Sequence, residues 1–223
     1  MTENKPFVVF GYGSLIFKPP PHVVAKSSYP FALLLKRRIQ FKLVVAPGFL
    51  KGYVRRFAQK SHDHRGTPEN PGRVVTLVHK EDWDKFSGSD AFPDEDVVWG
   101  KDRVYHRPCS ILTSRKKDFR EKDGYTLETL DIYNVDSEGN ESVIIHNAYC
   151  YVGRNDNPSF IGSEPLDALS KTIWRSVGPS GPNKEYLYRL ADAVRELSPS
   201  SYDSHLFALE ARLFTFIRAV HTT

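Results

Sequence analysis

The sequence predicts an α+β fold with a mixed or antiparallel sheet. Strand-like segments dominate residues 7–152, and the last third of the chain carries three segments with the apolar spacing of amphipathic helices. Strands that come first and helices that come last are typical of α+β domains. A length of 223 residues suits one domain with a substantial core, so we expect a single domain over residues 1–223.

The composition excludes several classes of protein. Apolar residues make up 40% of the chain and charged residues 26%, as in an ordinary globular protein, and the net charge of +4 is mild. The chain has no long basic stripe with interleaved aromatic residues, so we expect no nucleic-acid partner. It also has no signal-peptide pattern and no run near the roughly 20 apolar residues of a membrane helix. We therefore expect no membrane partner and a cytoplasmic location.

The cysteine content points the same way. Cys109 and Cys150 are the only two cysteines, and they form no Cys-x-x-Cys motif. This is neither a disulfide framework nor a redox or zinc signature, so we expect two reduced thiols in a cytosolic protein.

The first element is a short buried strand over residues 7–10 that runs into a glycine loop, Gly11-Tyr12-Gly13-Ser14-Leu15. Two glycines allow a turn with positive φ and close approach of another group. Successive N–H groups of such a turn can bind an anion or a polarised carbonyl, so we expect a binding loop. A plain strand and turn fits these residues equally well.

Three better-known glycine motifs do not fit this loop. A dinucleotide fingerprint needs a third glycine where Ile16 stands, and a nucleophile elbow around Ser14 needs glycine in place of Tyr12 and Ile16. A phosphate-binding P-loop would continue into Gly-Lys-Ser/Thr, which is absent.

The middle of the chain alternates between strands and turns. We expect strands over 52–61, 73–78 and 125–135, a strand that starts at 97–100, and a return strand over 142–152 that completes a hairpin. Residues 61–72 read as an ordered turn-rich loop, residues 80–96 as an acidic surface loop, and residues 109–121 as a helix that Gly124 ends. His62, Asp63 and His64 suggest a metal site, but no partner ligands with the spacing of a zinc site appear, and a loop held by side-chain hydrogen bonds explains them better.

Three helices follow, each with apolar residues spaced by three and four positions. Their apolar residues lie over 166–177, 187–197 and 206–220, and Gly178-Pro179 and Pro199 end the first two helices. We expect these apolar faces to form core rather than a groove for a partner.

Glu121 is the best acid–base candidate in the chain. It lies between Arg120 and Lys122, close before Gly124 and the strand that starts at Tyr125. A glutamate in such a charged run is more often solvated, so its role depends on whether it faces the glycine loop.

Five motifs occur in fixed order along the chain: residues 10–15, 63–68 with 71–74, 120–125, 151–153 with 155–157, and 178–181 with Asn183, Glu185, Tyr186 and Leu187. Together they resemble the ChaC family of glutathione-specific γ-glutamylcyclotransferases. The resemblance implies a small mixed β-barrel flanked by helices and a lyase that cleaves glutathione to 5-oxo-L-proline and L-cysteinylglycine without metal or other cofactor. It also implies that Glu121 is the catalytic carboxylate.

The family's substrate loop falls on Val9, Phe10, Gly11, Tyr12, Gly13 and Ser14, extended here to Leu15. Arg73 is a further candidate, because its guanidinium can hold both oxygens of a substrate carboxylate, although a structural ion pair fits it equally well. In this reaction the substrate's own α-amine attacks its γ-carbonyl, so a single carboxylate can act first as base and then as acid.

The sequence departs from the family pattern at three places. Residues 28–46 resemble an insertion, Lys101-Asp102-Arg103 predicts an interruption of the strand that leads toward Glu121, and Ala58 replaces a usual tryptophan, which predicts looser pocket packing. These departures favour an alternative, an inactive relative that binds a γ-glutamyl ligand or a protein partner without turnover. The oligomeric state is open at this point.

Overall fold

Five strands close into a small barrel in the computed structural model, which describes residues 7–18, 47–86, 88, 92, 97–105 and 125–221. The strand order is β1-β5-β2-β6-β7, in which β1 and β7 run parallel and the other neighbours antiparallel. The strands are β1 (Phe7–Gly11), β2 (Pro47–Lys51), β5 (Val97–Tyr105), β6 (Tyr125–Val135) and β7 (Glu141–Gly153). This confirms the small mixed barrel and the 125–152 hairpin.

Two shorter sheets complete the β-structure. β3 (Tyr53–Ser61) and β4 (Gly72–His79) form an antiparallel hairpin, whose end is the polar run 61–72. β8 (Val177–Gly178) and β9 (Gly181–Pro182) form a short ribbon before the second of the C-terminal helices.

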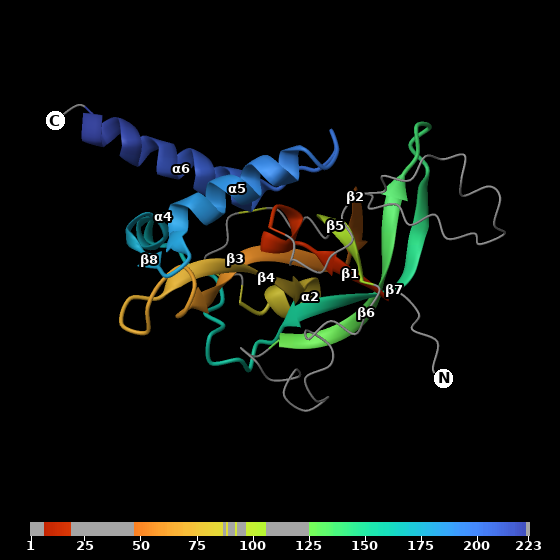
Figure 1. Cartoon of the computed structure of the whole chain (residues 1–223), viewed down its shortest axis with the longest axis horizontal. Helices are drawn as coiled ribbons and strands as arrows, with labels where there is room; N and C mark the ends of the chain where they lie inside the picture. The colour runs from red at the N-terminus through yellow and green to blue at the C-terminus, as the bar shows by residue number, and fades with distance from the viewer. Residues whose placement is uncertain are drawn as a thin grey trace.

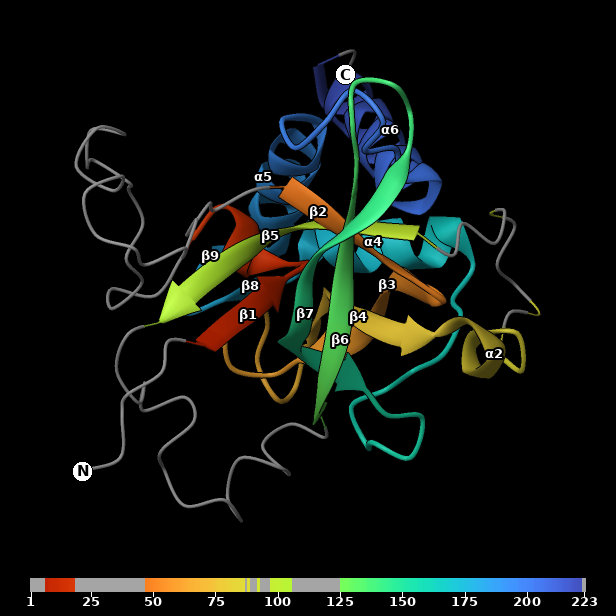
Figure 2. The same cartoon turned by 90° about the vertical axis from the view of Figure 1, so that its right-hand side faces the viewer.

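The three C-terminal helices are α4 (Leu166–Arg175), α5 (Asn183–Arg195) and α6 (Ser204–His221). Figures 1 and 2 show them gathered against one side of the strands. Their apolar residues are buried in the same cluster as the barrel strands, which confirms that these faces form core. The fully buried members are Leu169, Ile173, Leu187, Leu190, Ala191, Val194, Leu206, Leu209 and Leu213. None of the helices in the described part of the chain is long and apolar enough to cross a membrane.

The expected interruption at Lys101-Asp102-Arg103 is wrong, because β5 continues unbroken through these residues. β5 lies between β1 and β2, and Lys101 is paired with Gly11 on one side and with Pro47 on the other. Hydrogen bonds to two neighbouring strands hold the backbone extended whatever the propensity of the side chains. The main structural argument for a damaged relative is therefore removed.

The expected surface loop over 80–96 contains a short helix, α2 (Lys80–Trp83), that is anchored in the fold. Trp83 is buried in a small apolar cluster with Val54, Ala58 and Val78. This charged segment thus contributes one side chain, Trp83, to the core, which its polar composition did not predict. Ala58 packs in this cluster and not in the pocket described below, so the expectation of looser pocket packing is wrong.

Three expectations fall on residues outside the described part of the chain. These are the insertion over 28–46, the helix over 109–121 with Cys109, and Glu121 itself. Cys150 is described, and it is a free, fully buried thiol in the barrel.

Asp102 is a buried carboxylate on the barrel strand β5. It is fully buried opposite Phe10, and neither of its oxygens has a hydrogen-bond partner among the described residues. Burial raises the pKa of Asp102 from the ordinary 3.8 to about 7. Between pH 3.8 and about 7, the Asp102 carboxyl is therefore protonated in the folded protein and ionised in the unfolded chain.

The free energy of unfolding should consequently fall as the pH rises from 3.8 to about 7, by up to about 1.4 kcal/mol per pH unit. Asp102→Asn, which removes the titration at constant shape, should flatten this dependence and raise stability at pH 8. Urea denaturation at pH 5 and pH 8 tests this, with the exposed Glu138→Gln as control. An equal slope in Asp102→Asn and wild type would contradict it.

Candidate active site

A pocket of about 700 Å³ opens between the glycine loop and the end of the β3–β4 hairpin. Its walls come from the loop after β1, the end of β3, β4, the barrel strands β6 and β7, and helix α5. The lining residues are Phe10–Leu15, Phe17, Lys18, Gln59–Arg65, Val74, Val75, Tyr125, Tyr151, Ser159, Ser180 and Tyr186. The sequence-predicted loop therefore lies in the pocket wall, although its contact with a substrate stays a prediction.

The glycines of this loop allow close packing. A Cβ on Gly11 would lie 2.6 Å from the Leu15 Cβ, and a Cβ on Gly13 would lie 3.0 Å from Val75 Cγ2 and 3.3 Å from the Tyr186 hydroxyl. The expected positive φ is wrong: neither Gly11 nor Gly13 is among the described glycines with positive φ, and Gly13 has φ −124°. The loop needs glycine for space rather than for backbone conformation.

The loop continues as a one-turn 3₁₀ helix, η1 (Ser14–Ile16). Its hydrogen bonds begin with the Ile16 N–H, which donates to the Gly13 carbonyl at 3.0 Å, and the Lys18 N–H donates to the Ser14 carbonyl at 2.7 Å. Within the described residues, the N–H groups of Gly13, Ser14 and Leu15 have no acceptor. These donors can bind a carboxylate or a developing oxyanion.

Two buried tyrosines flank the glycine loop. Tyr12 and Tyr186 are 8% and 6% exposed, and burial raises the pKa of both phenols well above the ordinary value. The Tyr186 hydroxyl accepts the Val75 N–H at 3.4 Å. Both hydroxyls are therefore neutral near pH 7, so they line the pocket without adding negative charge.

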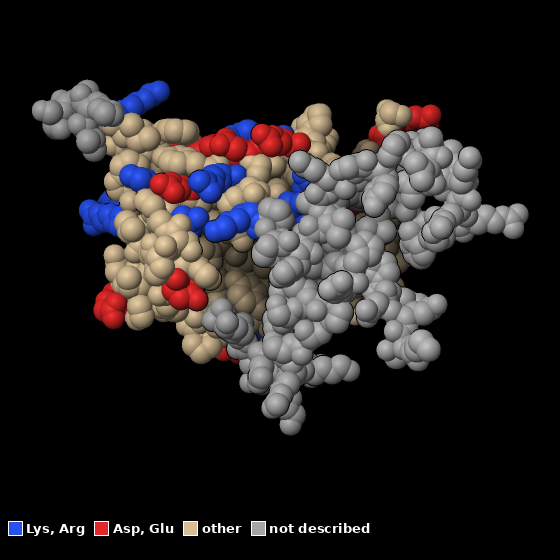
Figure 3. Space-filling view, in the orientation of Figure 1, with Lys and Arg blue, Asp and Glu red and all other residues tan. Residues whose placement is uncertain are grey.

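The charged side chains of the pocket are mainly basic. Among the described residues, Lys18, Lys60 and Arg65 line it, against a single carboxylate, Asp63. Figure 3 shows further Lys and Arg side chains in a band across the face that carries α4 and α5. This charge distribution favours an anionic ligand.

Arg65 differs from the other two cations because it is buried, at 7% exposure. Its guanidinium donates to the Pro182 carbonyl at 3.1 Å and lies 5.8 Å from the Tyr186 ring centre. Burial lowers the pKa of Arg65, although the nearby Glu185 opposes this shift. No carboxylate of the described chain lies within ion-pair distance of it. A buried cation without an ion pair at a pocket wall is suited to binding a carboxylate.

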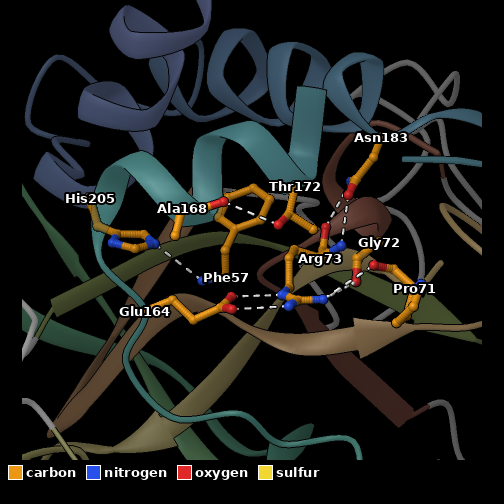
Figure 4. Close-up of polar contacts among 9 residues, drawn as sticks. All are labelled: Phe57, Pro71, Gly72, Arg73, Glu164, Ala168, Thr172, Asn183 and His205. Carbon is orange, nitrogen blue, oxygen red and sulfur yellow. Dashed lines mark hydrogen bonds and ion pairs between the residues drawn. The ribbon is translucent and has the colours of Figure 1, made fainter. Parts of the chain in front are cut away.

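Arg73, the sequence-predicted carboxylate partner, is not in the pocket lining. Its guanidinium donates to both oxygens of Glu164, at 2.7 and 3.0 Å, and to the carbonyls of Pro71 and Gly72 (Figure 4). Asn183 at the start of α5 bonds its backbone N–H and carbonyl. Arg73 therefore forms a structural ion pair, the second of the two roles that the sequence allowed, because its guanidinium is already bound to both oxygens of Glu164.

Val9 is also absent from the pocket lining, because its side chain is 2% exposed within the apolar core. His62 and His64 lie at the pocket wall, within 3.4 and 3.3 Å of the hydroxyls of Ser159 and Ser180. These contacts match a loop held by hydrogen bonds. The described residues contain no cluster of three or more His, Cys, Asp or Glu side chains that could hold a metal.

Sequence reasoning assigned no role to Arg65, Tyr186, Tyr125 or Tyr151. All four lie within the motifs that carry the family resemblance, so the signal was present. What was missing was the folding that brings residues from the β3–β4 loop, α5, β6 and β7 to one pocket.

Comparison with known proteins agrees with this architecture. A family model described as ChaC-like protein matches residues 7–215. A glutathione-specific gamma-glutamylcyclotransferase of Schizosaccharomyces pombe is 39% identical over 207 residues, covering 92% of this chain and 91% of its own, and one of Saccharomyces cerevisiae is 33% identical, covering 88% of each. A crystal structure of a glutathione-specific gamma-glutamylcyclotransferase from yeast aligns with a TM-score of 0.69 at 30% identity, covering 96% of this chain and 97% of that one.

Gly13→Ala should destabilise the fold, because the new methyl group meets Val75 Cγ2 and the Tyr186 hydroxyl at the distances given above. Overpacking of this kind costs about 1–3 kcal/mol in the free energy of unfolding. Gly88→Ala is the matched control, since nothing lies within 4 Å of its Cβ position. Guanidinium chloride denaturation measures both, and equal stability of the two variants would contradict the packing argument.

Proposed function

We propose that this chain, which belongs to the family of ChaC-like proteins, is a lyase that cleaves glutathione to 5-oxo-L-proline and L-cysteinylglycine. The observation that carries the proposal is a pocket that combines unpaired loop N–H groups with three cations. Glutathione carries two carboxylates and needs donors of this kind. The relatives named glutathione-specific gamma-glutamylcyclotransferases, 30–39% identical over most of the chain, support this substrate.

The reaction is an intramolecular displacement. The α-amine of the γ-glutamyl group loses a proton and attacks the γ-carbonyl, which forms the five-membered ring of 5-oxoproline. The amide C–N bond breaks, and the cysteine nitrogen takes up a proton. Since the nucleophile is tethered to its target, the protein supplies a folded substrate conformation and proton transfer.

We assign the proton transfer to Glu121, as base for the ammonium and then as acid for the leaving nitrogen. Its position in the chain supports this role. Glu121 is four residues before Tyr125, the first residue of β6 and part of the pocket wall. Four residues span at most about 14 Å when extended, so Glu121 is tethered within reach of the pocket.

The loop N–H groups of Gly13 and Ser14 are positioned to bind a substrate carboxylate or the oxyanion that develops at the γ-carbonyl. Arg65 supplies the carboxylate contact that sequence reasoning had given to Arg73. The continuous strand β5 removes the main structural argument for an inactive relative, so that alternative becomes an outcome of the experiment below.

Glu121→Gln should reduce 5-oxoproline release from glutathione by about 10²–10⁴-fold, because the amide can neither accept nor donate the transferred proton. Chromatographic measurement of 5-oxoproline with purified protein tests this. Glu196→Gln, an exposed carboxyl at the end of α5, is the control and should keep wild-type turnover.

Equal activity of Glu121→Gln and wild type would remove Glu121 from this role and leave the reaction in place. No release by a folded wild-type protein would contradict the proposed function. Deletion of residues 28–46 then separates the two explanations, because restored activity would identify the insertion as the cause, and continued inactivity would favour the relative that only binds.

Arg65→Lys should raise KM for glutathione by about 10–100-fold with a smaller effect on kcat, because lysine cannot offer two parallel donors to a carboxylate. Arg73→Lys, which alters an arginine bound to Glu164 outside the pocket, should keep KM near wild type. Equal KM values in both variants would contradict the assignment. Glutathione amidated at its glycine carboxylate then identifies which substrate carboxylate Arg65 binds. If the two KM values, of Arg65→Lys and of wild type, no longer differ with this substrate, Arg65 binds the glycine carboxylate.

A single catalytic domain, a cytosolic location and independence of metal and other cofactors stay predictions from the sequence.

A further inference from the structure

Two buried arginines outside the pocket lining hold the backbone of the glycine loop. Arg55 on β3 and Arg103 on β5 are 3% and 5% exposed. Between them they donate hydrogen bonds to the carbonyls of Tyr12, Leu15 and Ile16. Neither arginine is among the residues that line the pocket, although the loop that they hold is.

Arg55 joins the loop to two other parts of the molecule. Its Nη1 donates to the Tyr12 carbonyl at 3.0 Å and to the Trp99 carbonyl on β5 at 2.9 Å. Its Nε and Nη2 lie 2.7 Å from Asp203 Oδ2. Asp203 also accepts the Leu206 N–H in the first turn of α6 at 2.8 Å. The guanidinium is therefore held on both sides and cannot follow a movement of the loop.

This arrangement determines which way the loop amides point. Peptide bonds in the described chain are trans, and in a planar trans peptide the C=O and the N–H point in opposite directions. Arg55 holds the Tyr12 carbonyl, so the Gly13 N–H of the same peptide points to the side away from the Arg55 guanidinium. Without Arg55, a rotation of this peptide would place the carbonyl oxygen, an acceptor, where the site needs a donor.

Arg103 acts on the other end of the same turn. Its Nε donates to the Leu15 carbonyl at 3.0 Å and its Nη2 to the Ile16 carbonyl at 2.6 Å. These are the last carbonyls of the turn, and they lie opposite the free N–H groups of Gly13 and Ser14. Both ends of the loop are thus held by arginine, one end by Arg55 of β3 and the other by Arg103 of β5.

We infer that Arg55 and Arg103 are positioning residues: by binding the carbonyls of the glycine loop, they orient the N–H groups of that loop toward the substrate. The inference rests on the proposed function of the pocket. It assigns a role to two arginines that do not line the pocket, and it explains why strand β5 carries a buried arginine at position 103.

The test compares Arg55→Lys and Arg103→Lys with Arg73→Lys. All three variants exchange one buried or partly buried guanidinium for an ammonium. Arg73→Lys is the control, because the guanidinium of Arg73 bonds to Glu164, Pro71 and Gly72 and not to the glycine loop. We expect 5-oxoproline release to fall on the order of 10²-fold in kcat/KM for Arg55→Lys and Arg103→Lys, as for a displacement of about 1 Å at a reacting group. Arg73→Lys should stay within about threefold of wild type.

Each variant is assayed well below its own melting temperature, so that loss of folded protein does not enter the rates. Unchanged kcat/KM in Arg55→Lys and Arg103→Lys, or an equal fall in all three variants, would overturn the inference. If Arg55→Lys does not fold, Arg103→Lys decides, since Arg103 holds the Leu15 and Ile16 carbonyls and its replacement leaves the Arg55–Asp203 ion pair intact.

Binding of glutathione, measured by titration calorimetry in the Glu121→Gln background, separates this inference from the proposed reaction. If wild type binds glutathione without releasing 5-oxoproline, the reaction fails, and weaker binding by at least about tenfold in Arg103→Lys but not Arg73→Lys still supports the positioning role. Equal binding in both variants would overturn that role whatever the turnover.

Discussion

The Arg55 guanidinium stands at the junction of the glycine loop, the barrel and the last helix. It contacts Tyr12 in the loop, Trp99 in β5 and Asp203 at the start of α6, three segments that are far apart in sequence. Burial opposes ionisation of Asp203, but Arg55 and the Leu206 N–H outweigh it, and the pKa of Asp203 is lowered. Both partners are therefore charged, and removing either would leave a buried charge at a cost of about 3–5 kcal/mol.

Close packing is the second constraint on the site, and it acts through glycine. Gly100 on β5 faces the carbonyl of Gly11, 2.5 Å from its Cβ position, and the ring of Phe10 lies equally near. The strand that carries the loop thus fits against its neighbour only without a side chain at position 100. Gly13 lets the loop approach Val75 and the Tyr186 hydroxyl in the same way. The pocket lies at a place where the backbone, rather than side chains, forms one wall.

Several features were predictable from local patterns. Periodic apolar residues identified the three helices and their buried faces, and alternation with turn residues identified the 125–152 hairpin. Predictions for Lys101–Arg103 and for residues 80–83 were wrong for one reason. In both segments a charged run suggested irregular structure, a break in the strand in one and a surface loop in the other, while pairing with β1 and β2 or packing of Trp83 against β3 and β4 determined the structure. Composition reports average exposure and does not identify which member of a charged run is buried.

By itself the sequence determined the α+β class and the place of the glycine loop, because strand and helix periodicity and glycine spacing are local properties of the chain. The barrel flanked by helices followed from the resemblance of the five motifs to the family and not from periodicity. The tertiary structure decided which arginine serves which purpose. Arg55, Arg65, Arg73 and Arg103 look alike in the sequence, yet one holds the loop to α6, one faces the pocket, one is bound by Glu164 and one holds the end of the turn. The role of a charge depends on its partner and its burial, and here each partner or wall comes from a segment distant in sequence, which only folding brings into contact.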